Sequence, residues 1–438
     1  MTKQMLIVLL GLLTITIVSP AQKSITFVTL DNIGGVNFSL QGIDGNLYGI
    51  SGGGAIVRMT PTGLLTTLYN FCSEANCADG SGPGPLIQGL NSSLYGITTA
   101  GGAYGYGTVF EFTAAGKFKT LHSFCDPNTC DDGYGANVLV LAANRNIYGL
   151  TTAAASGCVW PNEGGALFEV TPNDKFSVVA PVCYQDAEPP TLFAQGVNGA
   201  LFASTWSFLI EHSYASSGGF YALNPQGAVV GGGEFCVDKK CDVSVHPVSA
   251  VEAPNGDFWG TWQSGQTLGG IYKFKEAEGF RPAFRITSNI VLTVFGSDGS
   301  VYGGDGGGTG SLIKFTPPKN VQIIHFFSPG KGGTPSVQHT NGDFYGSTGS
   351  AIFRLSTGLP PFLQTLPSAG KAGSVVFIKG TEISEATAAT FNGISASFVK
   401  ASPSALKAIV PQGVLGPVKV EVTLPGGHLL QGNFRILQ

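Results

Sequence analysis

The stretch LYGITTAGGAYGYGTVFEFTAAG, residues 94–116, contains the pattern that decides the fold. It opens with an apolar residue, an aromatic residue and a glycine. Variants of this core occur seven times, at intervals of about 40 to 60 residues, close to the length of one four-stranded blade of a β-propeller. The copies are Leu47-Tyr48-Gly49, Leu94-Tyr95-Gly96, Ile147-Tyr148-Gly149, Leu201-Phe202-Ala203, Phe258-Trp259-Gly260, Val301-Tyr302-Gly303 and Phe344-Tyr345-Gly346. The sequence therefore predicts seven repeats of one β unit.

The residues around each core predict the strands of the unit. Turn signals such as Asp44-Gly45 and Asn255-Gly256 precede the cores, and these residues favour the positive φ angles of a tight hairpin. A glycine-rich stretch and a further strand come next, as in GTVFEF at 107–112, and a polar turn then leads into a last strand. We expect four antiparallel strands in each unit, named A to D from the centre outward.

The seventh unit lacks a fourth strand, because Pro360-Pro361 ends any ladder soon after its third strand. The segment ITFVTL at 25–30 reads like FKTL at 118–121 and precedes the first unit. An N-terminal strand that closes the last blade would remove an open sheet edge. The expected fold is all-β: a seven-bladed β-propeller over residues 22–358, closed by this strand, and an immunoglobulin-like β-sandwich over residues 359–438.

The repeats resemble those of bacterial tandem-repeat surface proteins described as GloVer-containing, which have a choice of C-terminal anchors. The resemblance rests on motifs such as the one at 94–116 and covers about residues 36–355. It weakens where Phe202-Ala203 and Trp259 replace the usual tyrosine and glycine. It implies an exported repeat protein and carries over no catalytic residue.

The segment 374–436 looks like an IPT/TIG domain, an immunoglobulin-like β-sandwich of surface and regulatory proteins. The family usually has glycine-x-glycine-phenylalanine where this chain has Gly380-Thr381-Glu382-Ile383. The resemblance implies a spacer or protein-contact module and does not argue for catalysis. The matching motifs are Phe391-Asn392-Gly393, Val410-Pro411, Gly416-Pro417-Val418-Lys419-Val420 and Pro425-Gly426-Gly427.

The N-terminus and the composition indicate export. Lys3 precedes an uncharged run from Met5 to Val18, and small residues precede a cut ahead of Gln22, so residues 1–21 read as a signal peptide; an uncleaved anchor is the alternative. We expect no membrane span in the mature chain and an extracellular or cell-surface location. The net charge is −4 without a basic cluster, which excludes nucleic acid and anionic lipid as partners.

Eight cysteines in an exported chain are expected to pair. Four of them follow a fourth strand at the same point of their units, and three of these have a partner five residues on. In the third unit Glu188 takes that place, and the spare cysteine lies in a loop of the same face, so a bridge there is geometrically plausible. The predicted pairs are Cys72–Cys77, Cys125–Cys130, Cys158–Cys183 and Cys236–Cys241.

No complete catalytic or metal-binding set emerges from the sequence. Ser51 lies in a G-x-S-x-G match at 49–53, but the segment ends a strand and the serine elbow needs a strand-to-helix turn. We therefore predict no catalytic residue, no metal and no cofactor. No histidine stands at metal-ligand spacing among His122, His212, His246, His325, His339 and His428, while His122 and His325 share one place in their units, which suggests packing.

Carboxylates leave two chemical alternatives open. Asp126, Asp131 and Asp132 could offer oxygen ligands to calcium, although a solvated rim is the plainer interpretation. A glycosidase needs two carboxylates across a pocket, and the candidates lie in different loops. They are Glu163, Glu188, Glu211 and Asp305.

Aromatic residues in the loops suggest a binding face. We expect the connections from B to C and from D to the next A to emerge together, because A and C run away from that face and B and D return to it. Aromatic residues there offer stacking surfaces for a sugar or a protein, or else pack their own loops. The candidates are Trp160, Trp206, Trp262, Tyr104, Tyr106 and Tyr214.

The function that the sequence favours is non-catalytic recognition of an extracellular glycan or protein on this face. An extracellular carbohydrate-active hydrolase or lyase with carboxylates at the channel mouth is the first alternative. A structural surface-layer component is the second.

Overall fold

Strands dominate the computed structural model. It describes residues 25–31, 35–153, 163–184, 191–195, 201–205, 208–210, 213–215, 219–224, 229–234, 246–264, 268–275, 279–286, 290–305, 310–328 and 332–438. In these ranges the only helical segments are the short 3-10 turns η1 (Ala75–Cys77), η2 (Ile383–Glu385) and η3 (Pro425–Gly427). The all-β prediction is confirmed.

Seven antiparallel sheets of four or five strands, numbered 1 to 7 in chain order, and one two-stranded hairpin make up the described part of the repeat region. Sheet 1 contains β2 (Val36–Gln41), β3 (Leu47–Ser51), β4 (Ala55–Met59) and β5 (Leu65–Asn70). Sheet 2 contains β6 (Ser81–Pro83), β7 (Ile87–Gln88), β8 (Leu94–Ala100), β9 (Thr108–Phe112) and β10 (Phe118–Ser123). Sheet 3 contains β11 (Val138–Leu141), β12 (Ile147–Leu150), β13 (Glu163–Val170) and β14 (Phe176–Tyr184).

The remaining sheets repeat this order. Sheet 4 contains β15 (Thr191–Gln195), β16 (Leu201–Thr205), β19 (Gly219–Leu223) and β20 (Val229–Glu234), with a hairpin of β17 (Phe208–Ile210) and β18 (Ser213–Ala215) between β16 and β19. Sheet 5 contains β21 (His246–Glu252), β22 (Phe258–Ser264), β23 (Leu268–Lys275) and β24 (Gly279–Ile286). Sheet 6 contains β25 (Ile290–Phe295), β26 (Val301–Asp305), β27 (Ser311–Thr316) and β28 (Asn320–Phe326). Sheet 7 contains β29 (Gly333–Gln338), β30 (Phe344–Thr348), β31 (Ile352–Ser356) and β1 (Thr26–Asp31).

The tyrosine-glycine core is explained by packing within each sheet. The Tyr302 ring is buried, and its hydroxyl donates to Asp298 in the preceding turn over 3.0 Å, so the turn aspartate four residues earlier fixes the ring. A Cβ on Gly96 would overlap the ring of Phe110 on the next strand. A glycine there lets that aromatic ring lie flat across the sheet.

The N-terminal strand completes the last sheet. β1 pairs antiparallel with β31, with Phe27 opposite Leu355, which confirms the predicted role of residues 25–30. Sheets 1 and 7 are also neighbours, since β2 lies against β29. The Gln41 side chain accepts from Thr340 N over 2.8 Å, and Gln88 bridges sheets 2 and 1 in the same way by accepting from Ile43 N over 3.0 Å.

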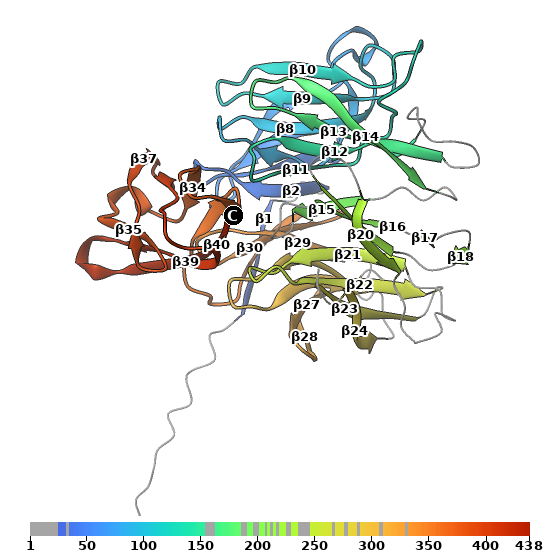
Figure 1. Ribbon diagram of the computed structural model, residues 1–438. Coiled ribbons are helices and arrows are strands. Elements are labelled where there is room, and N and C mark those ends of the chain that lie inside the picture. Colours follow the sequence, from blue (N-terminus) through green and yellow to red (C-terminus); the bar gives the residue numbers. More distant parts are fainter. Residues whose placement is uncertain are drawn as a thin grey trace, which may run out of the picture.

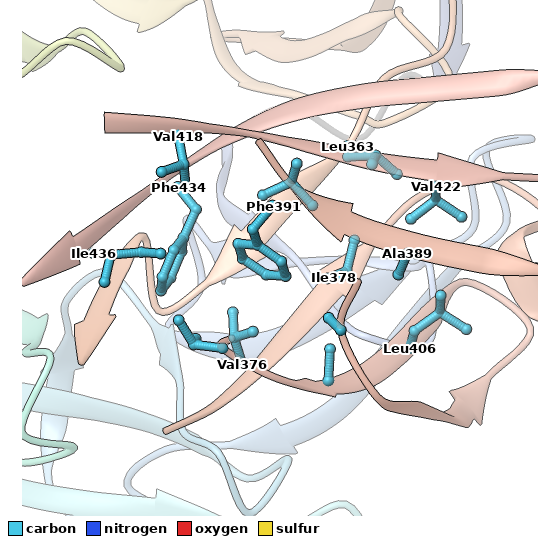
Figure 2. Packing of buried hydrophobic residues seen from close by; sticks show 14 of the residues in the cluster. Leu363, Val376, Ile378, Ala389, Phe391, Leu406, Val418, Val422, Phe434 and Ile436 are labelled. Atoms are coloured by element: carbon cyan, nitrogen blue, oxygen red, sulfur yellow. The ribbon is translucent and has the colours of Figure 1, made fainter. Parts of the chain in front are cut away.

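The C-terminal domain contains two sheets packed around one core. One contains β32 (Gln364–Leu366), β34 (Val375–Lys379), β38 (Ala405–Ile409) and β37 (Phe398–Ser402). The other contains β33 (Ala369–Lys371), β40 (Leu429–Leu437), β39 (Gly416–Thr423), β35 (Ala388–Phe391) and β36 (Ile394–Ser395). Figure 2 shows the buried side chains between them, with the rings of Phe391 and Phe434 edge to face at 5.5 Å.

The C-terminal domain is docked on one end of the sheets. This end, the turn face, consists of the turns between the first and second strands at 42–46, 253–257, 296–300 and 339–343. The buried Lys379 ammonium donates to Gln41 O over 2.8 Å, and the buried Arg435 pairs with Glu252 at 3.3 Å. In Figure 1 the orange and red domain lies at the left-hand ends of the sheets, and β17 and β18 lie at the opposite side.

Candidate functional site

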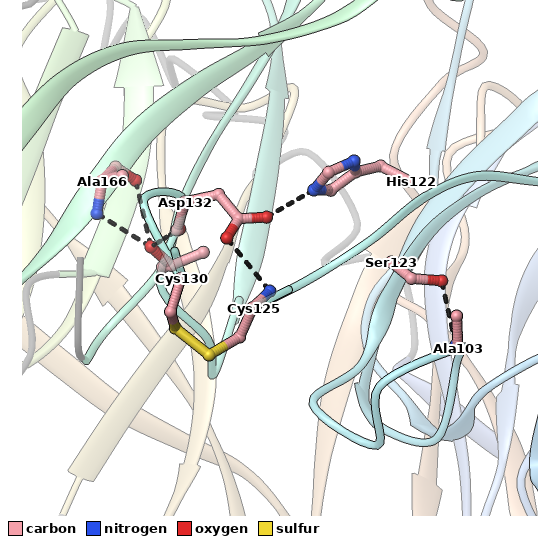
Figure 3. Close-up of polar contacts among 8 residues, drawn as sticks. Ala103, His122, Ser123, Cys125, Cys130, Asp132 and Ala166 are labelled. Carbon is pink, nitrogen blue, oxygen red and sulfur yellow. Dashed lines mark hydrogen bonds and ion pairs between the residues drawn. A yellow bond between two sulfur atoms is a disulfide. The ribbon is translucent and has the colours of Figure 1, made fainter. Parts of the chain in front are cut away.

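Two kinds of loop emerge together at the end of sheet 2 away from the turn face. The β8–β9 connection, residues 101–107, contacts the connection from β10 into β11, residues 124–137. Phe124 N donates to Gly107 O over 3.0 Å, and Ser123 Oγ accepts from Ala103 N over 3.1 Å (Figure 3). This confirms, for sheet 2, the prediction that B-to-C and D-to-A loops share a face. We call this end of the sheets the loop face.

Disulfides close the D-to-A loops of sheets 1 and 2. Cys72–Cys77 and Cys125–Cys130 are both bonded, as predicted from the repeat register. The other predicted pairs, Cys158–Cys183 and Cys236–Cys241, involve side chains outside the described residues. Short closed loops hold their neighbours in place with little conformational freedom to lose when a ligand binds.

A buried aspartate follows the second cysteine of each loop and organises it. Asp132 accepts from Cys125 N over 3.0 Å, and Asp79 accepts from Tyr69 Oη over 2.8 Å and from Ser73 N over 3.1 Å. Burial alone would raise the pKa of Asp79, but the bonds from Tyr69 and Ser73 lower it. Asp132 therefore serves the loop itself, which corrects its interpretation as part of a solvated rim.

His122 is a packing residue with a polar edge. Its ring stacks on Phe176 with centroids 3.6 Å apart, and its Nε2 lies 2.5 Å from the second oxygen of Asp132 (Figure 3). His325 stacks on Phe27 in the same way, so the packing role predicted for these two histidines is confirmed.

A groove opens beside these residues, between the outer strands β10 and β14. It encloses about 550 Å³. Its wall combines two aromatic rings, carboxylates and hydroxyl groups, an environment suited to a polar ligand with one apolar surface. The lining includes Tyr104, His122, Asp126, Thr129, Asp131 and Phe176.

Among the residues that the structure describes, three tyrosines are exposed on the loop face: Tyr104 is 41% exposed, Tyr106 43% and Tyr134 37%. The rings of Tyr106 and Tyr134 lie 5.1 Å apart with planes 35° apart. A hydrogen bond from Tyr104 to the Asp126 carboxylate raises the pKa of the tyrosine. The sequence predicted Tyr104 and Tyr106 as loop residues but missed Tyr134, although Gly133-Tyr134-Gly135 repeats the pattern of Gly105-Tyr106-Gly107.

The prediction that the loop tryptophans contact a ligand is wrong for Trp262, the one of the three whose side chain the structure describes. Trp262 is 4% exposed and packs with Phe202, Phe258 and Tyr272, so it offers no surface to a ligand. Strand β22 continues to Ser264, which places Trp262 inside the sheet instead of in the following loop. Trp160, Trp206 and the side chain of Tyr214 lie outside the described residues.

The chemical alternatives find no assembled site in the described part of the chain. Ser51 is the last residue of β3 and its Oγ accepts from Ala55 N over 3.1 Å, so it caps a hairpin and forms no nucleophile elbow. No group of three His, Cys, Asp or Glu side chains with metal-binding geometry occurs among the described residues. Asp305 ends β26, and the side chains of Glu163, Glu188 and Glu211 lie outside the described set.

Comparison with protein families agrees with these features. Residues 35–229 match the Gloeobacter/Verrucomicrobia repeat, and residues 362–436 match the IPT/TIG domain. The chain carries both. The seven sheets thus include the Gloeobacter/Verrucomicrobia repeats, and the domain docked on the turn face is the TIG domain. No curated protein matches the chain in sequence.

Solved structures resemble the repeat region in fold alone. A streptogramin B lyase is 12% identical with a TM-score of 0.56, covering 77% of this chain and 99% of its own. A catalytically inactive variant of virginiamycin B lyase from Staphylococcus aureus with quinupristin is 11% identical with a TM-score of 0.53, covering 76% and 99%. The fold of the chain is propeller-like. No helix in the described ranges has the length and apolar character needed to cross a membrane.

Proposed function

We propose that this chain is an exported, non-catalytic recognition protein that binds an extracellular glycan or protein on its loop face. The observation that carries the proposal is the contrast between the two ends of the sheets. The TIG domain covers the turn face, whereas the loop face presents the exposed tyrosines Tyr104, Tyr106 and Tyr134 and a groove that Tyr104 lines. Binding on a rigid scaffold is usually carried by such loops.

The scaffold in this proposal is a closed seven-bladed propeller followed by an immunoglobulin-like sandwich at residues 359–438. The pairing of β1 with β31 and the bridge from Gln41 to Thr340 support ring closure. Disulfides in the loops and the signal-peptide pattern of residues 1–21 support export and a location outside the cell.

The buried contacts of Lys379 and Arg435 support a fixed orientation of the TIG domain. Charged groups are buried only where partners hold them, so the two parts are expected to keep one relative position. With the turn face covered, the loop face is the open end at which a partner can approach.

A carbohydrate-active hydrolase or lyase is the second candidate. Two solved structures of similar fold are named as lyases, which motivates the candidate, although identities of 11% and 12% support fold similarity alone. The stacking of His122 on Phe176 and its contact with Asp132 favour a structural role for that histidine.

The proposal is tested by measuring binding of the purified mature protein on a glycan array and its activity on polysaccharides. The proposal predicts selective binding without turnover, weakened by about 1 kcal/mol or more in Tyr104→Ala, as for aromatic anchors at an interface. Leu64→Ala is the matched control, because Leu64 is 68% exposed in a turn at the opposite end of sheet 1. Turnover of a polysaccharide would favour the hydrolase or lyase. Loss of binding in the Leu64 variant alone would show that the ligand binds at the turn-face end of the sheets, which contradicts the proposal.

A further inference from the structure

The charge of the loops of sheets 1 and 2 restricts the ligands that can bind there. The loops at residues 72–86, 101–107 and 124–137 contain five carboxylates and no lysine or arginine. Uronic-acid, sulfated or phosphorylated ligands would meet repulsion there without a cationic partner. The carboxylates are Glu74, Asp79, Asp126, Asp131 and Asp132.

The exposed tyrosine pair supplies a stacking surface. Tyr106 and Tyr134 come from two different loops, and their rings lie 5.1 Å apart with an interplanar angle of 35°. Each is more than a third exposed, so a large part of each ring remains available. Such tilted aromatic surfaces suit a ring ligand with an apolar face and polar edges.

Hydrogen-bond acceptors line the groove and belong to the same two loops as the tyrosine pair. Tyr104 is two residues from Tyr106 in one loop, and Asp132 is two residues from Tyr134 in the other. Asp132 caps the disulfide loop and Asp126 accepts from Asn128, so the carboxylate of the groove that we assign to a ligand is the exposed Asp131. A carboxylate with two oxygens can accept from neighbouring hydroxyl groups at once.

We propose that the loop face of sheet 2 is a subsite for an uncharged sugar. One pyranose ring of the polysaccharide stacks on Tyr106 and Tyr134, and the hydroxyl groups of a further sugar residue along the same chain donate to Asp131 in the groove. This inference rests on the proposed recognition function and narrows its ligand to neutral polysaccharides.

The test measures binding of the purified mature protein to three soluble polysaccharides: a neutral glucan, polyanionic alginate and polycationic chitosan, each at low and high salt. The inference predicts binding to the neutral glucan with little salt dependence, at least tenfold weaker in Tyr106→Ala and in Tyr134→Ala. Asp131→Asn should weaken binding several-fold. Tyr106→Phe keeps the ring and should bind like the parent, which separates stacking from misfolding.

Other outcomes overturn the inference in distinguishable ways. Binding to alginate, or salt-sensitive binding to chitosan alone, would show a charged ligand and leave the recognition function intact. Neutral-glucan binding that survives both tyrosine substitutions would place the sugar elsewhere. Binding abolished by Leu64→Ala and unaffected by the loop variants would overturn the proposed function as well.

Discussion

The imidazole of His325 stacks on the ring of Phe27, with centroids 4.0 Å apart and planes 7° apart. His122 on Phe176 has the same relation, at 3.6 Å and 5°. In each case the histidine lies on the fourth strand of one sheet, and the phenylalanine lies near the start of the fourth strand of the next sheet. The N-terminal strand β1 therefore acts as the fourth strand of sheet 7 in packing as well as in hydrogen bonding.

Removal of the Phe27 ring should weaken this closure. We expect Phe27→Ala to lower the free energy of unfolding by about 2 kcal/mol, less than for a fully buried phenylalanine because the side chain is partly exposed. Urea denaturation measures it. Val28→Ala, an exposed neighbour on the same strand, should change stability by less than about 0.5 kcal/mol. Equal stability of the Phe27 variant and the parent would mean that β1 contributes nothing to ring closure.

The carboxylate of Asp132 should stabilise the disulfide loop. Asp132→Ala leaves the buried Cys125 N–H without its acceptor and should cost about 1–3 kcal/mol. Asp131→Ala is the matched control, because the adjacent carboxylate is exposed and should be nearly neutral. Thermal unfolding of both variants checks this. A larger loss in the Asp131 variant would contradict the assignment.

The contact between the turns of sheets 7 and 1 should lose stability in mild acid through His339, whose ring bonds to Gly45 O. Burial lowers the pKa of this histidine below its usual 6.5, and the nearby Lys379 lowers it further. The hydrogen bonds to Gly45 and Asn341 and the charge of Asp343 act in the other direction, but the effect of burial is the largest. As pH falls below 6.5 the unfolded state takes up a proton that the folded state resists, so stability falls. Urea midpoints between pH 7.5 and 5 should show a smaller fall in His339→Gln than in the parent. An identical pH profile of the two proteins would refute this role.

Lys379 makes a prediction of the same sign at alkaline pH, since its pKa is also lowered by burial. Burial lowers its pKa from 10.5 to about 8, so between these values the folded state has lost a proton that the unfolded state keeps. Stability should therefore rise with pH in this window, by at most roughly 3 kcal/mol. Lys379→Met should lack that rise and be no less stable than the parent near pH 7, since it buries no charge. A parallel pH dependence in both proteins would show that Lys379 is not buried at the interface.

The repeat pattern made much of the fold predictable. The tyrosine, the glycine and the turn aspartate each have a local packing reason, as Tyr302, Gly96 and Asp298 show. The N-terminal strand and two disulfides followed from register, because each unit repeats the same positions. Local pattern and global fold agree in such repeats, which is why the sequence indicates them.

Docking of the TIG domain was not predictable in the same way. Lys379 and Ser402 of the TIG domain donate to the backbone carbonyls of Gln41 and Ile43. Any residue at positions 41 and 43 would present the same carbonyl group, so the sequence does not mark these contacts. Trp262 was misplaced because β22 continues past the repeat core, and sequence patterns place strand ends poorly. Tyr134 was missed although its flanking glycines repeat those of Tyr106, because contact of the two rings depends on how the two loops approach each other.

Hydrogen exchange of the mature protein with and without a bound neutral polysaccharide reports which loops the ligand covers. Binding at the loop face predicts slower exchange at residues 101–107 and 124–137 and no change in the turn at 253–257. Slower exchange confined to the turn face, with the loops at 101–107 and 124–137 unaffected, would contradict it.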